Sequence, residues 1–244
     1  MTAYAGRVAG HPIECTEGRT TLRGVPDVLV LDTATPAVTA AVVRVTAGGV
    51  EPLSVRVASD ARRHGELLAP AVEAVLAAAG LAVADLAAVV AGVGPGPFTG
   101  LRVGLVTAAV LADVAGIPAY GVCSLDGVAV AGHRLLVATD ARRREVYWAA
   151  YHDGVRVAGP EVSRPADVPV GTLGVTAMAG GGARAYADVL GLPLVGPDGP
   201  DPVALARVGA DRVLAGAPAE PLTPLYLRRP DAAEPGRPKA VTPA

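Results

Sequence analysis

Lysine and cysteine are nearly absent from this chain, and each scarcity excludes a class of site. Lys239 is the only lysine and lies in a proline-rich tail, which excludes a P-loop lysine and a Schiff-base lysine. The two cysteines, Cys15 and Cys123, are far apart and form no C-x-x-C pair, so neither a disulfide framework nor a thiolate zinc site is expected. A reducing, cytoplasmic location is the simplest interpretation.

Aromatic residues and excess charge are scarce as well. Phe, Trp and Tyr make up 3% of the sequence, which argues against a base-stacking surface. The formal net charge is −2, so no global basic field exists to hold nucleic acid unaided.

Apolar residues, in contrast, are abundant. They make up 51% of the 244 residues, enough for one large domain or two small ones. The long apolar run Ala74–Val93 is interrupted by Gly80 and Asp85 and ends at Gly94. It therefore predicts a helix, a turn and a buried strand, and no association with a membrane is expected.

Composition and pattern divide the chain into four regions. Residues 1–27 have no period and no continuous apolar run, and we expect a disordered extension there, consistent with an over-long gene start. Residues 230–244 are rich in proline and small residues and predict a flexible tail. Between them, one short apolar strand ends in Asp32 and another leads to Asp140. This pseudo-repeat predicts two related lobes, residues 28–132 and 133–229.

The first lobe contains two predicted apolar helices, His64–Ala79 and Leu101–Ala115. The second carries a stripe of small residues, which would let another helix approach closely: Gly100, Gly104, Ala108 and Ala112. Further strands are predicted at Val38–Val45, Leu53–Val57, Leu86–Val93 and Pro118–Val122. Further helices are predicted after Val122 through Ala131, over Ala183–Leu190 and over Pro202–Ala215.

Two glycine- and threonine-rich turns are candidate nucleotide sites. Asp32 and Thr33 follow the first strand, where they could hold a magnesium–phosphate group or form a structural Asx turn. The second turn precedes a helix, where an anion is favoured. Its candidate residues are Gly94, Gly96, Thr99 and Gly100. Pro95 and Pro97 remove two amide donors from it, so a rigid packing turn is the slightly favoured alternative.

No metal site or nucleophilic triad is predicted. A helical histidine pair would need a partner three or four residues after His64, and those positions hold Leu67 and Leu68. Cys123 has no nearby histidine and predicts buried packing. The basic run Arg142–Arg144 fits either a phosphate or RNA contact or a solvated turn.

Four stretches of the chain together resemble the TsaB/YeaZ family. They are VLVLDTAT at Val28–Thr35, GVGPGPFTGLRVG at Gly92–Gly104, TDARRREVYW at Thr139–Trp148 and PLYLR at Pro224–Arg228. The resemblance runs in order from about Val28 to Pro230. It implies an α/β chain with the two-lobed actin-like ATPase fold of the sugar-kinase superfamily, in agreement with the pseudo-repeat.

The resemblance also implies a role. Members of this family are the non-catalytic subunit that pairs with a catalytic paralogue, TsaD. With the ATPase TsaE, the complex threonylcarbamoylates N6 of the tRNA adenosine next to the anticodon. The paralogue's His-x-x-x-His metal pair is broken here, because Leu68 stands four residues after His64. The resemblance thus predicts a chain without catalytic residues or a tightly bound cofactor, with ATP or ADP at the interface shared with its partner.

The family's interface is a bundle of the first two helices of each subunit. We expect the following contacts here: Leu68, Val72, Val75, Gly104, Ala108 and Leu111. The same helices would allow a homodimer when the partner is absent. Two alternatives remain: a free-standing actin-fold ATPase or small-molecule kinase using Asp32 and Asp140, and a protease-like hydrolase, for which the sequence supplies no nucleophile.

Overall fold

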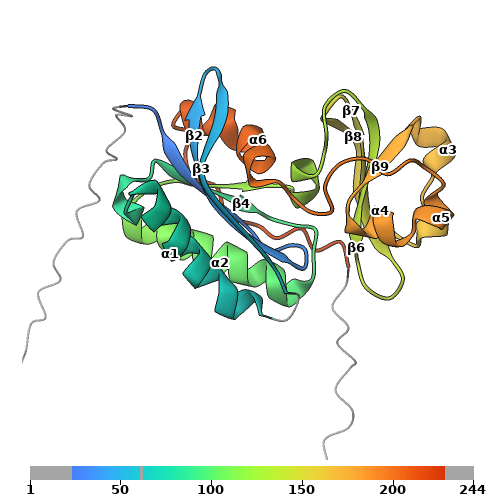
Figure 1. Ribbon diagram of the computed structural model, residues 1–244, viewed down its shortest axis with the longest axis horizontal. Helices are drawn as coiled ribbons and strands as arrows, with labels where there is room; N and C mark the ends of the chain where they lie inside the picture. Colours follow the sequence, from blue (N-terminus) through green and yellow to red (C-terminus); the bar gives the residue numbers. More distant parts are fainter. Residues whose placement is uncertain (1–23, 61–62, 229–244) are drawn as a thin grey trace, which may run out of the picture.

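Two β-sheets form the centres of two lobes joined side by side (Figure 1). The structure is a computed structural model that describes residues 24–60 and 63–228. The first sheet has the order β3-β2-β1-β4-β5, and the second has the order β8-β7-β6-β9. The expected extension at residues 1–27 falls mostly outside the described residues, and the expected tail at 230–244 lies wholly outside them.

The first sheet consists of an antiparallel meander followed by two parallel strands. Its strands are β1 (Asp27–Asp32), β2 (Ala37–Thr46), β3 (Gly49–Ser59), β4 (Ala88–Gly92) and β5 (Ala119–Val122). β1 pairs with β2 antiparallel and with β4 parallel. Strands β1 and β4 are apolar along nearly their whole length because helices cover both faces of this sheet.

Helices α1 (His64–Ala79) and α2 (Phe98–Ala115) cover one face of the first sheet, and α6 (Pro202–Leu214) covers the other (Figure 1). Gly80 and Gly116 end α1 and α2 in left-handed conformations, with φ of 69° and 66°. Each long helix therefore ends where a glycine removes the steric penalty of that conformation.

The second lobe repeats the plan of the first in shortened form. Its strands are β6 (Arg134–Asp140), β7 (Val146–His152), β8 (Val155–Ser163) and β9 (Ala177–Ala179). β6 pairs with β7 antiparallel and with β9 parallel, as β1 pairs with β2 and β4. The predicted pseudo-repeat is confirmed, and the two-lobed architecture is that of the actin-like ATPases.

Short helices differ most from the sequence-based expectations. The expected helix after Val122 is only a 3₁₀ turn, η2 (Ser124–Gly127). The expected helix Ala183–Leu190 is two short pieces, α4 (Gly181–Ala185) and α5 (Ala187–Leu190), separated at Tyr186. The remaining short elements are η1 (Val83–Asp85), η3 (Pro165–Asp167) and α3 (Val170–Leu173). The predicted order of helix, turn and strand across Ala74–Val93 is confirmed by α1, η1 and β4.

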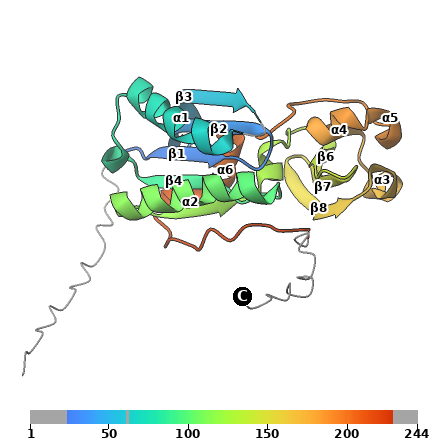
Figure 2. The same cartoon turned by 90° about the horizontal axis from the view of Figure 1, so that it is seen from below.

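The predicted boundary of the second lobe needs correction at its end. The chain leaves the second lobe before α6, whose Leu205 and Val213 pack with Val30 and Val90 of the first sheet. The segment after α6 also returns, running along α2 (Figure 2), and its Leu222 packs against the first core. The prediction followed sequence order and assigned these residues to the second lobe, whereas they pack on the sheet of the first lobe.

Helix α2 is long and apolar enough to cross a membrane by length and composition, the one such helix within the described residues. Its inner side contributes to the core of the first lobe through Leu101, Leu105 and Ala108. A helix that packs on a sheet passes the same test, so this observation is weak evidence for a membrane span.

Candidate functional site

Asp32 ends β1 and is fully enclosed by the chain's own donors. Its carboxylate is 1% exposed. Ser124 Oγ donates to Oδ2 at 2.5 Å, and the Ala34 amide donates to Oδ1 at 3.0 Å. Ser124 Oγ in turn accepts from the Gly94 amide at 3.1 Å. The Asx turn considered for Asp32 is therefore present, and it is tied to the turn after β4.

Burial raises the pKa of Asp32 to about 6, because a charged carboxylate loses its hydration there. The hydrogen bonds from Ser124 and Ala34 and the nearby His64 act in the opposite direction. A Cβ at Gly92 would fall 1.8 Å from Asp32 Oδ2, so the carboxyl also fills the space left by a missing side chain.

Thr33 connects the turn after β1 to helix α2. Its hydroxyl donates to the Gly100 carbonyl at 2.8 Å and accepts from the Gly104 amide at 3.1 Å. A Cβ at Gly104 would lie 2.4 Å from Thr33 Oγ1. Gly104 is therefore needed for close approach between α2 and this turn.

The glycine-proline turn packs against the same segment. A Cβ at Gly96 would lie 2.2 Å from the Ala34 carbonyl oxygen, so two stretches of backbone touch here. Gly94 is buried, whereas Thr99 is exposed. The structure brings the predicted nucleotide-site residues together, and the polar groups of Asp32 and Thr33 are bonded to neighbouring parts of the chain. This geometry favours the packing interpretation of both turns.

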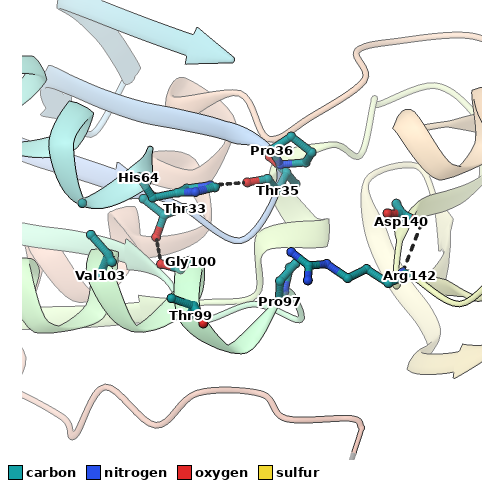
Figure 3. Close-up of a pocket in the computed structure, with 11 residues that line it drawn as sticks. Thr33, Thr35, Pro36, His64, Pro97, Thr99, Gly100, Val103, Asp140 and Arg142 are labelled. Carbon is teal, nitrogen blue, oxygen red and sulfur yellow. Dashed lines mark hydrogen bonds between the residues drawn. The ribbon is translucent and has the colours of Figure 1, made fainter. Parts of the chain in front are cut away.

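A cavity of about 150 Å³ lies beside these turns, between the two lobes (Figure 3). The first lobe supplies threonines and the starts of both long helices, and the second lobe supplies Asp140 and Arg142. Its lining residues are Thr33, Thr35, Pro36, His64, Gly65, Pro97, Thr99, Gly100, Val103, Asp140 and Arg142. Figure 3 shows Arg142 reaching from the second lobe toward Pro97.

The turn between β6 and β7 mirrors the turn after β1 in one hydrogen bond. The Arg142 amide donates to Asp140 Oδ1 at 3.1 Å, as the Ala34 amide donates to Asp32. The second turn differs in conformation, because Arg142, Arg143 and Arg144 have φ of 60°, 52° and 61°. Consecutive left-handed residues other than glycine are uncommon, and strained positions of this kind cluster at functional sites. Sequence reasoning found this basic run and missed its position at the cavity.

His64 has a structural contact. Its ring Nε2 lies 2.8 Å from the Thr35 carbonyl oxygen, an acceptor, so this nitrogen carries the proton. Within residues 24–60 and 63–228, no group of three or more His, Cys, Asp or Glu side chains is placed to hold a metal. Cys123 is buried, as predicted, and burial raises the pKa of its thiol to about 11, which disfavours a reactive thiolate.

The predicted interface residues are mostly on the wrong side of their helices. Five are buried in the chain's own core: Leu68, Val72, Val75, Gly104 and Ala108. Leu111 is partly buried against the same core. The small-residue stripe faces the turn after β1, and helical spacing alone cannot distinguish a sheet or a turn from a partner helix.

The exposed side of α2 is also apolar. Val106, Val110 and Val114 are 61%, 54% and 78% exposed and recur every four residues, so they form one row, here called the outer valine row. Contiguous exposed apolar surface is a feature of sites at which proteins bind partners or ligands.

An exposed aromatic cluster, which sequence reasoning did not predict, lies at the start of α2. Phe98 and Tyr226 stack with ring centroids 5.0 Å apart, and they are 44% and 39% exposed. The Arg102 guanidinium lies 3.7 Å from the Phe98 ring centroid, and its Nε donates to Tyr226 Oη at 3.0 Å. The GPFTGLR and PLYLR stretches contain these residues, and only the fold joins them.

Comparison with known proteins gives consistent matches. Residues 38–176 match the family described as TsaD, tRNA N6-adenosine threonylcarbamoyltransferase. An uncharacterized protein of Mycobacterium tuberculosis is 53% identical over 208 residues, which cover 84% of this chain and 93% of that protein. The tRNA threonylcarbamoyladenosine biosynthesis protein TsaB of Escherichia coli is 40% identical over 96 residues, which cover 37% of this chain and 42% of TsaB.

Solved structures agree with the sequence matches. YeaZ from Pseudomonas aeruginosa superimposes with a TM-score of 0.66 at 27% identity, covering 83% of this chain and all of that one. A second Pseudomonas aeruginosa structure, described as similar to the peptidase YeaZ, gives a TM-score of 0.69 with the same identity and coverage. The family match spans more than half of the chain, and the structural matches span most of it. This chain therefore belongs to the TsaD family and is a TsaB/YeaZ-like member of it.

Proposed function

We propose that this chain is a non-catalytic subunit that binds a TsaD-like catalytic protein and supports threonylcarbamoylation of tRNA, at N6 of the adenosine next to the anticodon. Membership of the family supports the connection with this modification. The observation that carries the subunit role is the outer valine row, because a chain acting alone gains nothing from exposing it.

The outer valine row has the properties of one half of an obligate interface. Such interfaces are more apolar than ordinary protein surface and resemble a divided core. Burying an exposed valine contributes on the order of 1 kcal/mol, so three in a row favour association by a few kcal/mol before the entropic cost of binding. The exposure of Val106, Val110 and Val114 supports an interface on that side of α2.

The contacts at the cavity support a role without catalysis. Asp32, the carboxylate that a free-standing ATPase would use, is enclosed by Ser124 and Ala34. The Thr33 hydroxyl is engaged with Gly100 and Gly104. His64 bonds to the Thr35 carbonyl and has Leu68 where a second metal ligand would stand.

Other components follow from the same proposal. ATP or ADP would bind at the surface shared with the catalytic partner, and the ATPase TsaE would act on the assembled complex. In the absence of the catalytic partner, two copies of this chain would pair through the same valine row. A cytoplasmic location accompanies this role, because tRNA is modified there.

Reconstitution with purified components tests the proposal. We expect tRNA modification by the TsaD-like protein of the same organism, with TsaE, to depend on this chain, whereas this chain alone modifies no tRNA. ATP hydrolysis by the pure chain that disappears in Asp32→Ala would instead support the free-standing ATPase. Full modification in the absence of this chain would contradict the subunit role.

A further inference from the structure

We propose that Phe98, Arg102, Tyr226 and the Arg142–Arg144 turn form one surface that binds single-stranded RNA, with bases on the rings and phosphates on the arginines. This RNA surface extends the proposed function and rests on it for the choice of RNA, since a tRNA loop is the expected substrate of the complex. It gives this chain a direct role in holding tRNA.

The aromatic half of the surface is unusual for this sequence. The chain has one phenylalanine, and the fold leaves that ring 44% exposed beside an exposed tyrosine. Arg102 lies over the Phe98 ring and its Nε also donates to Tyr226 Oη, so it contacts both rings while they stay partly exposed. Exposed rings beside a guanidinium are the groups on which unpaired RNA bases stack.

The basic half of the surface places three arginine side chains at the surface of the second lobe. Arg142, Arg143 and Arg144 are all exposed. Within the described residues, the guanidinium groups of Arg142 and Arg144 make no salt bridge. Three adjacent left-handed residues carry a backbone cost of about 1 kcal/mol or more each. An anionic ligand would pair with the exposed guanidinium groups of Arg142 and Arg144.

The two halves are connected by the segment that contains Tyr226 and Arg228. Arg228 donates from Nη1 to the Ala141 carbonyl at 2.9 Å, and its Nη2 pairs with Glu145 at 3.0 Å, so it holds the base of the arginine turn. Tyr226 stands two residues earlier in the same segment, stacked on Phe98. The cavity also connects the two halves, because Thr99 and Arg142 both line it (Figure 3).

The combination of groups favours single-stranded RNA over a duplex or an acidic protein. A duplex would contact the arginines but would keep its bases stacked away from Phe98 and Tyr226. An acidic segment would pair with the arginines without needing exposed rings. Because the net charge is −2, the binding would be local, modest in affinity and sensitive to salt.

The test is fluorescence anisotropy at low salt, with the full chain and a labelled anticodon stem–loop RNA. The charge variant is the double change Arg142→Asn and Arg144→Asn, because asparagine tolerates the left-handed backbone and the turn should fold. The ring variant is Phe98→Leu with Tyr226→Leu, which keeps apolar contacts between α2 and the returning segment. Arg207→Ala removes an exposed arginine from α6, on the other face of the first sheet, and is the matched control.

We expect wild type and Arg207→Ala to bind the stem–loop RNA with the same affinity. The affinity of both test variants should be lower than that of the wild type by a factor of about ten or more. The charge variant should also lower the dependence of log affinity on log salt by about 1 for each phosphate that the missing arginines would have bound. The ring variant should leave that dependence nearly unchanged. Circular dichroism checks that both variants are folded.

Three outcomes would overturn the RNA surface. The wild type could fail to bind the stem–loop RNA, both test variants could bind it as tightly as the wild type, or the wild type could bind a plain RNA duplex as tightly as the stem–loop. Competition by a polyglutamate peptide that is lost in the charge variant, without any effect of the ring variant on RNA, would assign the turn to an acidic protein. Binding to the TsaD-like protein is measured in parallel. If the wild type binds the TsaD-like protein but no RNA, the RNA surface alone is refuted. If the wild type does not bind the TsaD-like protein, the proposed function is refuted.

Discussion

The inner and outer sides of helix α2 are both apolar, yet they have opposite environments. The inner side carries small residues, and Gly104 lies against Thr33 so closely that a Cβ would collide with its hydroxyl. The outer side carries Val106, Val110 and Val114, which stay exposed in the part of the chain that the structure describes. Small residues therefore mark where the chain packs on itself, and the larger exposed ones mark where we expect a partner.

The substitution with the most severe expected outcome disrupts the packing of the inner side of α2. Gly104→Val should lower the free energy of unfolding by about 3 kcal/mol or more, because Thr33 is buried and cannot move away without losing its bonds to α2. Urea denaturation measures the change.

Gly65→Ala is the matched control at the start of α1, since its added Cβ would meet nothing within 4 Å. It should leave stability unchanged or raise it by up to about 1 kcal/mol. Equal stability of Gly104→Val and wild type would show that α2 does not need the close approach.

The next effect concerns the buried carboxyl of Asp32, the residue before the Thr33 that contacts the inner side. Because burial raises the pKa of Asp32 from 3.8 to about 6, the native state holds its proton more tightly than the unfolded state. The resulting stabilisation is fully present below the ordinary pKa and is lost as the pH rises through about 6. It amounts to about 3 kcal/mol, at about 1.4 kcal/mol for each unit of pKa.

Asp32→Asn should remove this pH dependence while keeping a group of the same shape beside Ser124. Urea denaturation of both proteins across the pH range from about 4 to 7 measures the difference. Relative to the variant, wild type should lose stability as the pH rises. A difference between the two that stays constant would contradict the assignment of a raised pKa to Asp32.

The smallest effect concerns the outer side. Val110→Glu should change the free energy of unfolding by no more than about 0.5 kcal/mol, because that side chain is exposed and touches no core. Val208→Glu, at an exposed valine of α6, is the matched control. A large loss of stability in Val110→Glu alone would mean that the valine row belongs to the fold of the single chain.

Periodicity and the pseudo-repeat predicted most of the fold. Strands that end in Asp32 and Asp140, the two long helices and the turn between α1 and β4 all follow from local pattern. The return of α6 to the first sheet did not, because an amphipathic helix does not encode which distant sheet it covers.

The candidate site was predictable in its residues but not in its contacts. The sequence identified Asp32, Thr33 and the glycine turn. In the fold, Asp32 accepts hydrogen bonds from Ser124 and Ala34, and the Thr33 hydroxyl bonds to Gly100 and Gly104. Ser124 carries no motif of its own, so its bond to Asp32 appears only in three dimensions. The predicted partner interface fell on the inner side of α2, because residues on both sides of the helix repeat at helical spacing. The Phe98–Tyr226 stack joins residues far apart in sequence.

Binding to the TsaD-like protein of the same organism shows whether the exposed side of α2 is a docking surface. Affinity is measured by calorimetry for wild type, Val110→Glu and Val208→Glu, each shown to be folded by circular dichroism. We expect a stable complex for wild type and Val208→Glu, and loss of binding for Val110→Glu. No complex with wild type, or equal affinity for all three proteins, would contradict the claim that the exposed side of α2 is the docking surface for a catalytic partner.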